Sequence, residues 1–122
     1  MRFDEPVTIN QVAASALARG GVITRHLTQM FLRQTPRLVE VSPPNVDDSD
    51  ILATSAALIE LFAERRKEAA PKWTTHIQRQ GTPIFLLTCR PETFTYRLCL
   101  EESPPPLRKR GLYAPDNYLT FA

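Results

Sequence analysis

Residues that commonly perform catalysis are few and scattered in this 122-residue sequence. Its two histidines, His26 and His76, belong to no HExxH or HxxxH pattern, which are the spacings that place two metal ligands on one helix face. Cys89 and Cys99 match neither a zinc site nor a thioredoxin-like pair, so both are expected to be buried, reduced thiols. GxSxG, P-loop and GxGxxG motifs are also absent from the sequence. We therefore predict no catalytic residue, no metal site and no cofactor, and a non-enzymatic protein is favoured.

A first group of residues that could bind a partner lies in a predicted pair of helices, residues 8–34. If Gly21 is the turn glycine of a helix-turn-helix motif, outward-facing polar side chains of the second helix can reach bases or phosphates. Leu17 argues against this motif, because a small residue usually lets the two helices approach at that position. An ordinary helical hairpin fits equally well. The predicted nucleic-acid contacts of this alternative are Thr24, Arg25 and Gln29.

A second group lies in residues 104–122, which combine prolines, a basic triplet and large apolar side chains. Three consecutive prolines stiffen the start of this segment. Its apolar residues are too few to form a core, so an extended docking tail is expected beside a helical domain of residues 1–103. The tail could dock on its own chain or on a partner, and the sequence leaves both open. The predicted partner-binding residues are Leu107, Arg108, Lys109, Arg110, Tyr113, Tyr118 and Phe121.

The stretch of residues 103–119 also carries a resemblance. It contains a Pro-x-Leu-Arg-x-Arg step at residues 105–110, then Leu112-Tyr113, Pro115 and Tyr118-Leu119. This ending resembles that of small bacterial proteins encoded beside nucleotidyltransferase-like proteins, an arrangement suggestive of toxin–antitoxin pairs. Weaker similarity extends to Trp73 and to residues 83–86. The resemblance implies a protein partner of the nucleotidyltransferase type, and it transfers no catalytic residue.

Composition indicates one ordinary globular domain. The chain is 43% hydrophobic and 23% charged, which argues against wholesale disorder and against collagen-like and coiled-coil classes. A net charge of +2 is too small to indicate a nucleic-acid-binding protein by itself. No apolar run approaches the roughly 18 residues that span a bilayer. The first six residues carry acids and a proline where a signal peptide needs an apolar core, so a cytoplasmic location is expected.

The elements that position these residues are expected to be mainly helices. Thr8 and Gln11 form a capping box before the first helix, and Thr24 is a plausible cap for the second. Residues 38–41 are expected to be extended. The acidic run at residues 47–50 could bind a cation, but it lacks EF-hand spacing and is better explained as the start of a long helix. Helical periodicity then continues from Ile51 to the basic residues before Pro71.

The second half is less regular. Residues 73–81 are expected to form a polar loop, with Trp73 packing back onto the helices. Residues 83–87 are expected to form a short buried element, either helix or strand. Residues 94–100 alternate as a strand would, yet Pro91-Glu92 is a good helix start and a helix is preferred. The predicted fold class is mainly α, a small helical bundle with a Pro-rich extended C-terminal tail.

Two functional hypotheses follow. The first is a non-enzymatic protein-binding subunit, an antitoxin that restrains a nucleotidyltransferase-like partner. Its basic triplet, residues 108–110, would pair with carboxylates such as those that hold metal ions in a nucleotidyl-transfer site. Replacing the three basic residues with alanine should then abolish neutralisation of the partner without unfolding the helices. The alternative is a helix-turn-helix-like DNA-binding transcriptional regulator, whose affinity should fall steeply with salt. A structural subunit of a larger assembly and a homo-oligomer remain open.

Overall fold

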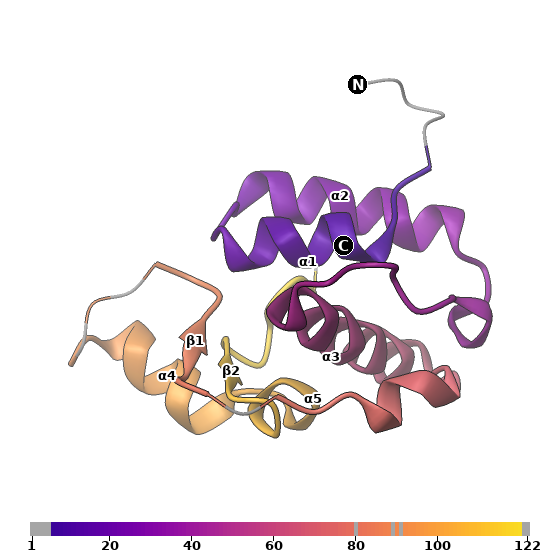
Figure 1. The fold of residues 1–122 in the computed structure, drawn as a ribbon. Coiled ribbons are helices and arrows are strands. Elements are labelled where there is room, and N and C mark those ends of the chain that lie inside the picture. The colour runs from indigo at the N-terminus through magenta and orange to yellow at the C-terminus, as the bar shows by residue number, and fades with distance from the viewer. Residues whose placement is uncertain (1–5, 80, 89, 91, 121–122) are drawn as a thin grey trace.

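A computed structural model describes residues 6–79, 81–88, 90 and 92–120. Helices form most of the regular structure in these residues, which confirms the mainly α fold class. A hairpin of α1 (Ile9–Leu17) and α2 (Val22–Gln34) covers one side of α3 (Ser49–Arg66), and the C-terminal segment covers another side (Figure 1). Helix α3 is therefore the central element, and both the hairpin and the C-terminal segment pack against it.

The acidic run before α3 begins the helix, as predicted. The Asp48 carboxylate accepts hydrogen bonds from the backbone N–H groups of Asp50 at 2.8 Å and Ile51 at 3.1 Å. These are two of the donors that a helix start leaves without an intrahelical partner. The helix ends where Lys67 adopts the left-handed conformation, and the Glu68 N–H then turns back to the Ala63 carbonyl at 2.9 Å.

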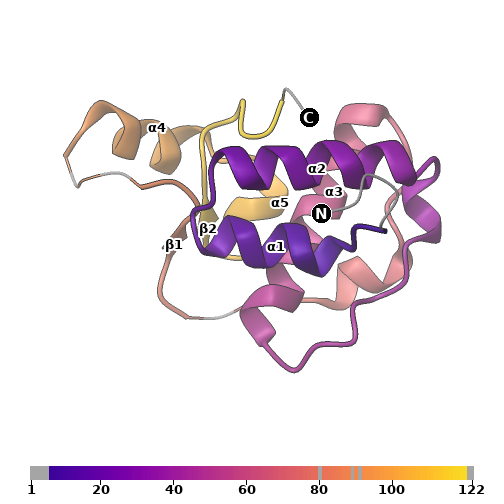
Figure 2. The same cartoon turned by 90° about the horizontal axis from the view of Figure 1, so that it is seen from above.

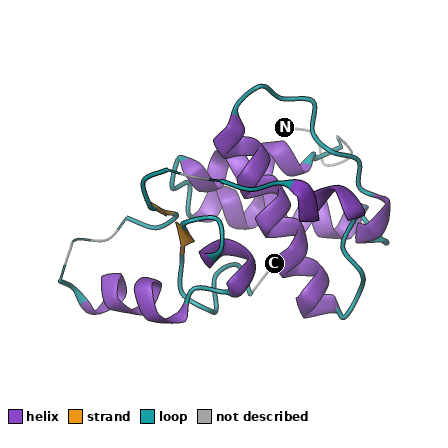
Figure 3. Ribbon diagram, turned by 60° about the horizontal axis from the view of Figure 1, so that its bottom comes forward, coloured by secondary structure: helices purple, strands orange, loops and turns teal. Residues whose placement is uncertain are grey.

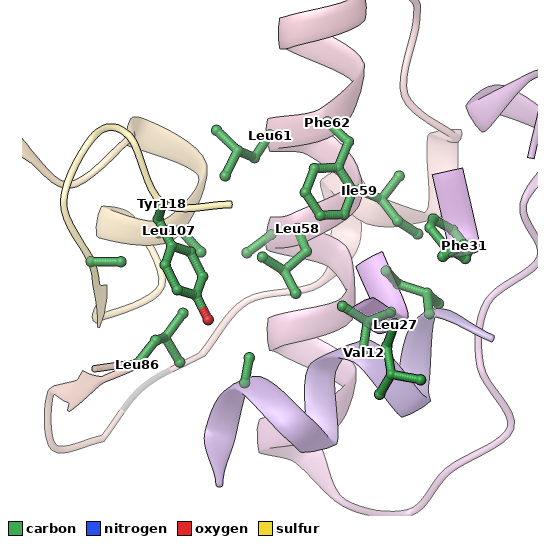
Figure 4. Close-up of a cluster of buried hydrophobic side chains, with 14 of the residues drawn as sticks. Val12, Leu27, Phe31, Leu58, Ile59, Leu61, Phe62, Leu86, Leu107 and Tyr118 are labelled. Carbon is green, nitrogen blue, oxygen red and sulfur yellow. The ribbon is translucent and has the colours of Figure 1, made fainter. Parts of the chain in front are cut away.

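Side chains from two distant parts of the chain meet α3 from different sides. Residues 53–59 of α3 are all buried, so the helix has almost no solvent-facing surface in its middle. Figure 4 shows Val12, Leu27 and Phe31 of the hairpin on one side and side chains of the C-terminal segment on the other. Small residues on both α1 and α3 allow their backbones to approach closely; they are Ala13, Ala16, Ala53, Ala56 and Ala57.

The hairpin begins as predicted, but its second helix does not. The Thr8 N–H donates to the Gln11 side-chain carbonyl at 2.9 Å, which is one half of the expected capping box. The start of α2 is Val22, preceded by Gly21 with a φ of 55°. Thr24 is therefore not the cap; it lies inside the helix, buried, with its hydroxyl 2.6 Å from that of Ser15. The sequence did not indicate this contact, because Ser15 and Thr24 belong to different helices and meet only when the two helices pack together.

Two 3-10 helices connect the larger elements. Residues expected to be extended form η1 (Leu38–Glu40), because Leu38 is buried and its carbonyl accepts the Val41 N–H at 3.0 Å. The predicted polar loop begins inside η2 (Lys72–His76). Trp73 packs against the core, and its indole N–H donates to the Val41 carbonyl at 2.7 Å, which confirms its role as an anchor.

The C-terminal half contains two more helices and a strand pair. In parallel register, β1 (Ile84–Phe85) pairs with β2 (Leu112–Tyr113). The helix preferred for residues 94–100 is confirmed as α4 (Phe94–Glu102). Figure 2 shows α4 at one end of the molecule, beyond the turn that joins α1 and α2.

The extended tail is not confirmed. Its prolines begin α5 (Pro105–Arg108), because a proline at the first helical position has the required φ and needs no hydrogen-bond acceptor. The apolar residues that follow are not exposed: Leu107, Leu112 and Ala114 belong to the same core as the hairpin and α3. Residues 104–120 thus dock on their own chain.

Replacing Asp48 with Ala should lower the free energy of unfolding by about 1 kcal/mol, because two backbone N–H groups lose their acceptor. Asp48→Asn should be close to the wild type, since asparagine caps helices about as well. Urea unfolding of the three proteins measures the difference. Equal stability of the Ala variant and the wild type would contradict this account of the helix start.

Candidate functional site

The predicted tail residues do not form one exposed surface. Leu107 and Arg110 are buried and Tyr118 is almost so; burial raises the pKa of the Tyr118 hydroxyl. Arg108 and Lys109 are exposed and Tyr113 is half-buried. Phe121 lies outside the described residues. The basic triplet is therefore divided between the interior and the surface.

Arg110 is 1% exposed and uses its whole guanidinium group inside the chain. Both terminal nitrogens donate to the Glu60 carboxylate, at 2.8 and 3.2 Å. The remaining N–H groups donate to three backbone carbonyls, those of Ile77 at 3.0 Å, Pro106 at 2.9 Å and Thr74 at 2.8 Å. These contacts occupy all five donors of the side chain. The sequence predicted that Arg110 would pair with a carboxylate of a partner, but it pairs with Glu60 of its own chain. That prediction is therefore wrong: Arg110 is a structural residue and not a binding residue.

Glu60 lies on α3 and is shared by two cations. In addition to Arg110, the Lys109 ammonium group lies 3.0 Å from the same carboxylate. Burial alone would raise the pKa of Glu60, but hydrogen bonds from Arg110 and Lys109 and the positive charge of Arg110 lower it below its ordinary value. The sequence held one signal for this site: a single acidic residue between Ile59 and Leu61, within an apolar stretch of the long helix.

A second buried arginine lies beside this pair. Arg79 donates to the Asp50 carboxylate at 2.8 Å, to the Thr82 carbonyl at 2.8 Å and to the Arg110 carbonyl at 3.3 Å. A cleft of about 320 Å³ opens here, lined by Thr75, Ile77, Gln78, Arg79, Lys109 and Arg110. Because Glu60 offsets the charge of Arg110 and Lys109 and Asp50 offsets that of Arg79, this cleft offers a ligand much less positive charge than its lining suggests.

In contrast, α4 exposes large apolar side chains. Figure 3 shows this helix standing apart from the others, and only Cys99 is fully buried in it. Phe94 is 76% exposed and Leu100 is 42% exposed. Arg97, which is also exposed, lies three residues from each, so the three share one helix face.

Specific contacts hold α4 in place. The Tyr96 ring stacks on Phe85 of β1 at 4.8 Å, and Phe85 stacks on Tyr113 of β2 at 5.3 Å. At the C-terminal end of α4, the buried Ser103 hydroxyl accepts the Ala114 N–H at 2.9 Å and lies 2.6 Å from the Cys99 carbonyl, to which it can donate. The helix is thus attached to the strand pair rather than to α3.

Two predicted binding residues lie beside α4. The Arg108 guanidinium group donates to the Glu101 carbonyl at 2.6 Å, and Tyr113 is the last ring of the stack under Tyr96. We call this region the α4 surface. It consists of Phe94, Arg97, Leu100, Arg108 and Tyr113.

The predicted nucleic-acid contacts are only partly on the surface. Arg25 is exposed and Gln29 is half-buried, whereas Thr24 is buried and cannot reach a base. Figures 1 and 2 show α1 and α2 side by side as an antiparallel hairpin. A helix-turn-helix motif sets its helices at roughly 90–120°. The arrangement is the ordinary hairpin.

Cys99 is buried, as expected, and Cys89 lies outside the described residues. Within the part of the chain that the structure describes, no three metal-binding side chains lie together. No helix in that part has the length and apolar character needed to cross a membrane. Comparisons with protein-family models, with curated proteins and with solved structures found no match to this chain.

Replacing Arg110 with Ala should lower the free energy of unfolding by about 3 kcal/mol, because the Glu60 carboxylate, which is 12% exposed, would lose its bidentate partner and keep only Lys109. Arg110→Lys keeps the charge but not the planar fork, so an intermediate loss is expected. The exposed Arg108→Ala variant is the control and should change stability by less than about 0.5 kcal/mol. Similar urea midpoints for the Arg108 and Arg110 variants would show that the triplet is not divided as described.

Acid should weaken the fold partly through Glu60. Its pKa is lowered in the folded protein, so its stabilising contribution is complete above the ordinary value of 4.5 and is lost as the pH falls below that value. The Glu60→Gln variant has no such group to protonate. Its unfolding free energy should therefore fall less steeply with acid than that of the wild type, in urea titrations at a series of pH values. Identical slopes would exclude this contribution.

Proposed function

We propose that this protein is a non-enzymatic protein-binding subunit that contacts its partner through the α4 surface. The observation that carries the proposal is the exposure of Phe94 on a helix outside the core. Aromatic and arginine side chains dominate the binding energy of protein interfaces, and an exposed aromatic ring on the same helix as the exposed Arg97 and Leu100 has the composition of such a centre. Core packing gives no reason for these side chains to be there.

The geometry of α4 favours binding by a preformed surface. The Thr93 hydroxyl accepts the Tyr96 N–H at 3.2 Å and caps the helix directly before Phe94. The Tyr96–Phe85 stack then limits rotation of the helix against the strands. A side chain held in this way loses less conformational entropy on binding than one on an extended tail.

The partner we propose is a nucleotidyltransferase-like protein, which this chain would restrain as an antitoxin in the cytoplasm. Support comes from the resemblance of residues 103–119 to proteins encoded beside such partners. In the revised mechanism, Arg97 and Arg108 pair with carboxylates of the partner, and Phe94 is the apolar anchor. Arg110 has no part in binding, because its donors are used by Glu60 and by backbone carbonyls.

The DNA-binding regulator remains the alternative function. Exposed Arg25 and half-buried Gln29 of α2 support it, whereas buried Thr24 and the antiparallel hairpin do not. Its affinity for DNA would fall steeply with salt concentration, whereas the affinity of a protein partner anchored by Phe94 would fall less.

Replacing Phe94 with Ser should weaken binding to the proposed nucleotidyltransferase-like partner by about 30-fold, the effect of losing an interface anchor worth about 2 kcal/mol. Isothermal titration calorimetry of the purified proteins measures this affinity. Val39→Ser is the matched control, since Val39 is an exposed apolar residue on η1, and it should leave the affinity unchanged.

Two results would overturn different parts of the proposal. Absence of binding by the wild-type protein would exclude this partner. Binding that survives both Phe94→Ser and Leu100→Ser would exclude the α4 surface. Equal urea midpoints of the wild type and the variants are required, so that lost binding is not confused with unfolding.

A further inference from the structure

A second surface lies on the outer side of α2 and has its own charge and shape. From Pro6 to Val39 the sequence contains four arginines and no acidic residue. In α2, Arg25, His26 and Arg33 are exposed, with Gln29 half-buried between them. Successive positions three or four residues apart lie on one side of a helix, so these side chains form a cationic stripe.

The stripe begins at an apolar groove. Val22, which is 77% exposed, lies three residues before Arg25 and continues the stripe toward the start of α2. Beside it is a groove of about 310 Å³ between α2 and the C-terminal segment, which runs alongside the helix in Figure 2. The groove is lined by Gly21, Val22, Arg25, Leu87, Pro115, Asn117, Tyr118 and Leu119.

We propose that this groove and the α2 stripe dock an acidic polypeptide segment that carries an apolar anchor. The anchor would enter the groove against Val22, Leu87 and Leu119, and carboxylates farther along the segment would pair with Arg25 and Arg33. From Val22 to Arg33 the stripe is about 16 Å long at 1.5 Å per residue, the length of roughly three helical turns. Recognition of an amphipathic helix in a groove uses this combination of one apolar anchor and repeated charges.

Charge and apolar exposure together favour a polypeptide over nucleic acid. A phosphate backbone would satisfy the arginines, but it would leave Val22 and its neighbour Ile23, 64% exposed, in contact with water. Few phosphate contacts also mean weak binding at physiological salt. An acidic segment with an apolar residue at one end covers both parts of the surface.

This surface is independent of the α4 surface and can be tested without the partner proposed above. The probe is a fluorescein-labelled helical peptide with a Leu-Phe anchor at one end and glutamates at helical spacing along one face. Fluorescence anisotropy with the full-length protein gives its dissociation constant. Matched probes carry lysine in place of glutamate, or serine in place of the anchor, and a double-stranded DNA oligonucleotide is the fourth probe.

Three variants should each weaken binding of the acidic anchored peptide by about tenfold or more: Arg25→Glu, Arg33→Glu and Val22→Ser. The control Lys72→Glu makes the same charge reversal at an exposed position of η2 and should leave binding unchanged. Phe94→Ser should also have no effect, which separates this surface from the α4 surface.

Failure of the acidic peptide to bind, or equal binding of the lysine and glutamate probes, would overturn the proposal. Tighter binding of the DNA than of the peptide, unaffected by Val22→Ser, would overturn it in favour of nucleic acid. Urea midpoints must again match the wild type for every variant that is compared.

Discussion

The hydrogen-bonded ion pair between Glu60 and Arg110 fixes the geometry of segments that also meet through the apolar core. The Glu60 carboxylate on the central helix is only 12% exposed, so an unpaired charge there would be unfavourable. Arg110 is the partner of this carboxylate, and its remaining N–H groups donate hydrogen bonds to the carbonyls of Thr74, Ile77 and Pro106. One side chain thereby fixes α3, η2 and α5 relative to each other.

The position of α4 follows from the same interaction. Gly111 comes directly after Arg110, and its φ of 71° turns the chain into β2. Strand β2 then pairs with β1, whose Phe85 ring carries the stack that supports Tyr96 of α4. The exposed Phe94 is thus held by a series of contacts that begins at the buried pair, and loss of Arg110 should disturb binding through folding rather than through contact with a partner.

Local signals in the sequence were enough to predict most helices, because caps and periodicity depend on neighbouring residues. Asp48 before α3 is an example. The start of α4 differs from the Pro91-Glu92 start that the sequence suggested: Thr93 is its cap, the helix begins at Phe94, and Pro91 lies outside the described residues. The errors involve contacts between residues far apart in the chain. Glu60 and Arg110 are separated by 50 positions, and Ile84 pairs with Leu112. The sequence of a basic triplet does not show which of its members face water and which face a carboxylate of the same chain. Of the α4 surface, only Arg108 and Tyr113 were therefore predicted as binding residues.

The abundance of arginine over lysine has a structural use in this chain. Arg66 donates to the carbonyls of Thr35 and Pro36, and Arg19 donates to that of Phe85, so guanidinium groups join segments that share no regular secondary structure. A planar side chain with five donors can hold several carbonyls at once, which an ammonium group cannot do in a fixed geometry.

The contacts of each arginine within the chain therefore have to be known before that arginine is assigned to a partner. Arg97 on α4 and Arg25 and Arg33 on α2 lie on exposed helix faces, and each has an exposed apolar side chain on the same face. Charge next to an apolar anchor is what a protein interface requires, and a rigid helix presents both at lower entropic cost than the extended tail that the sequence suggested.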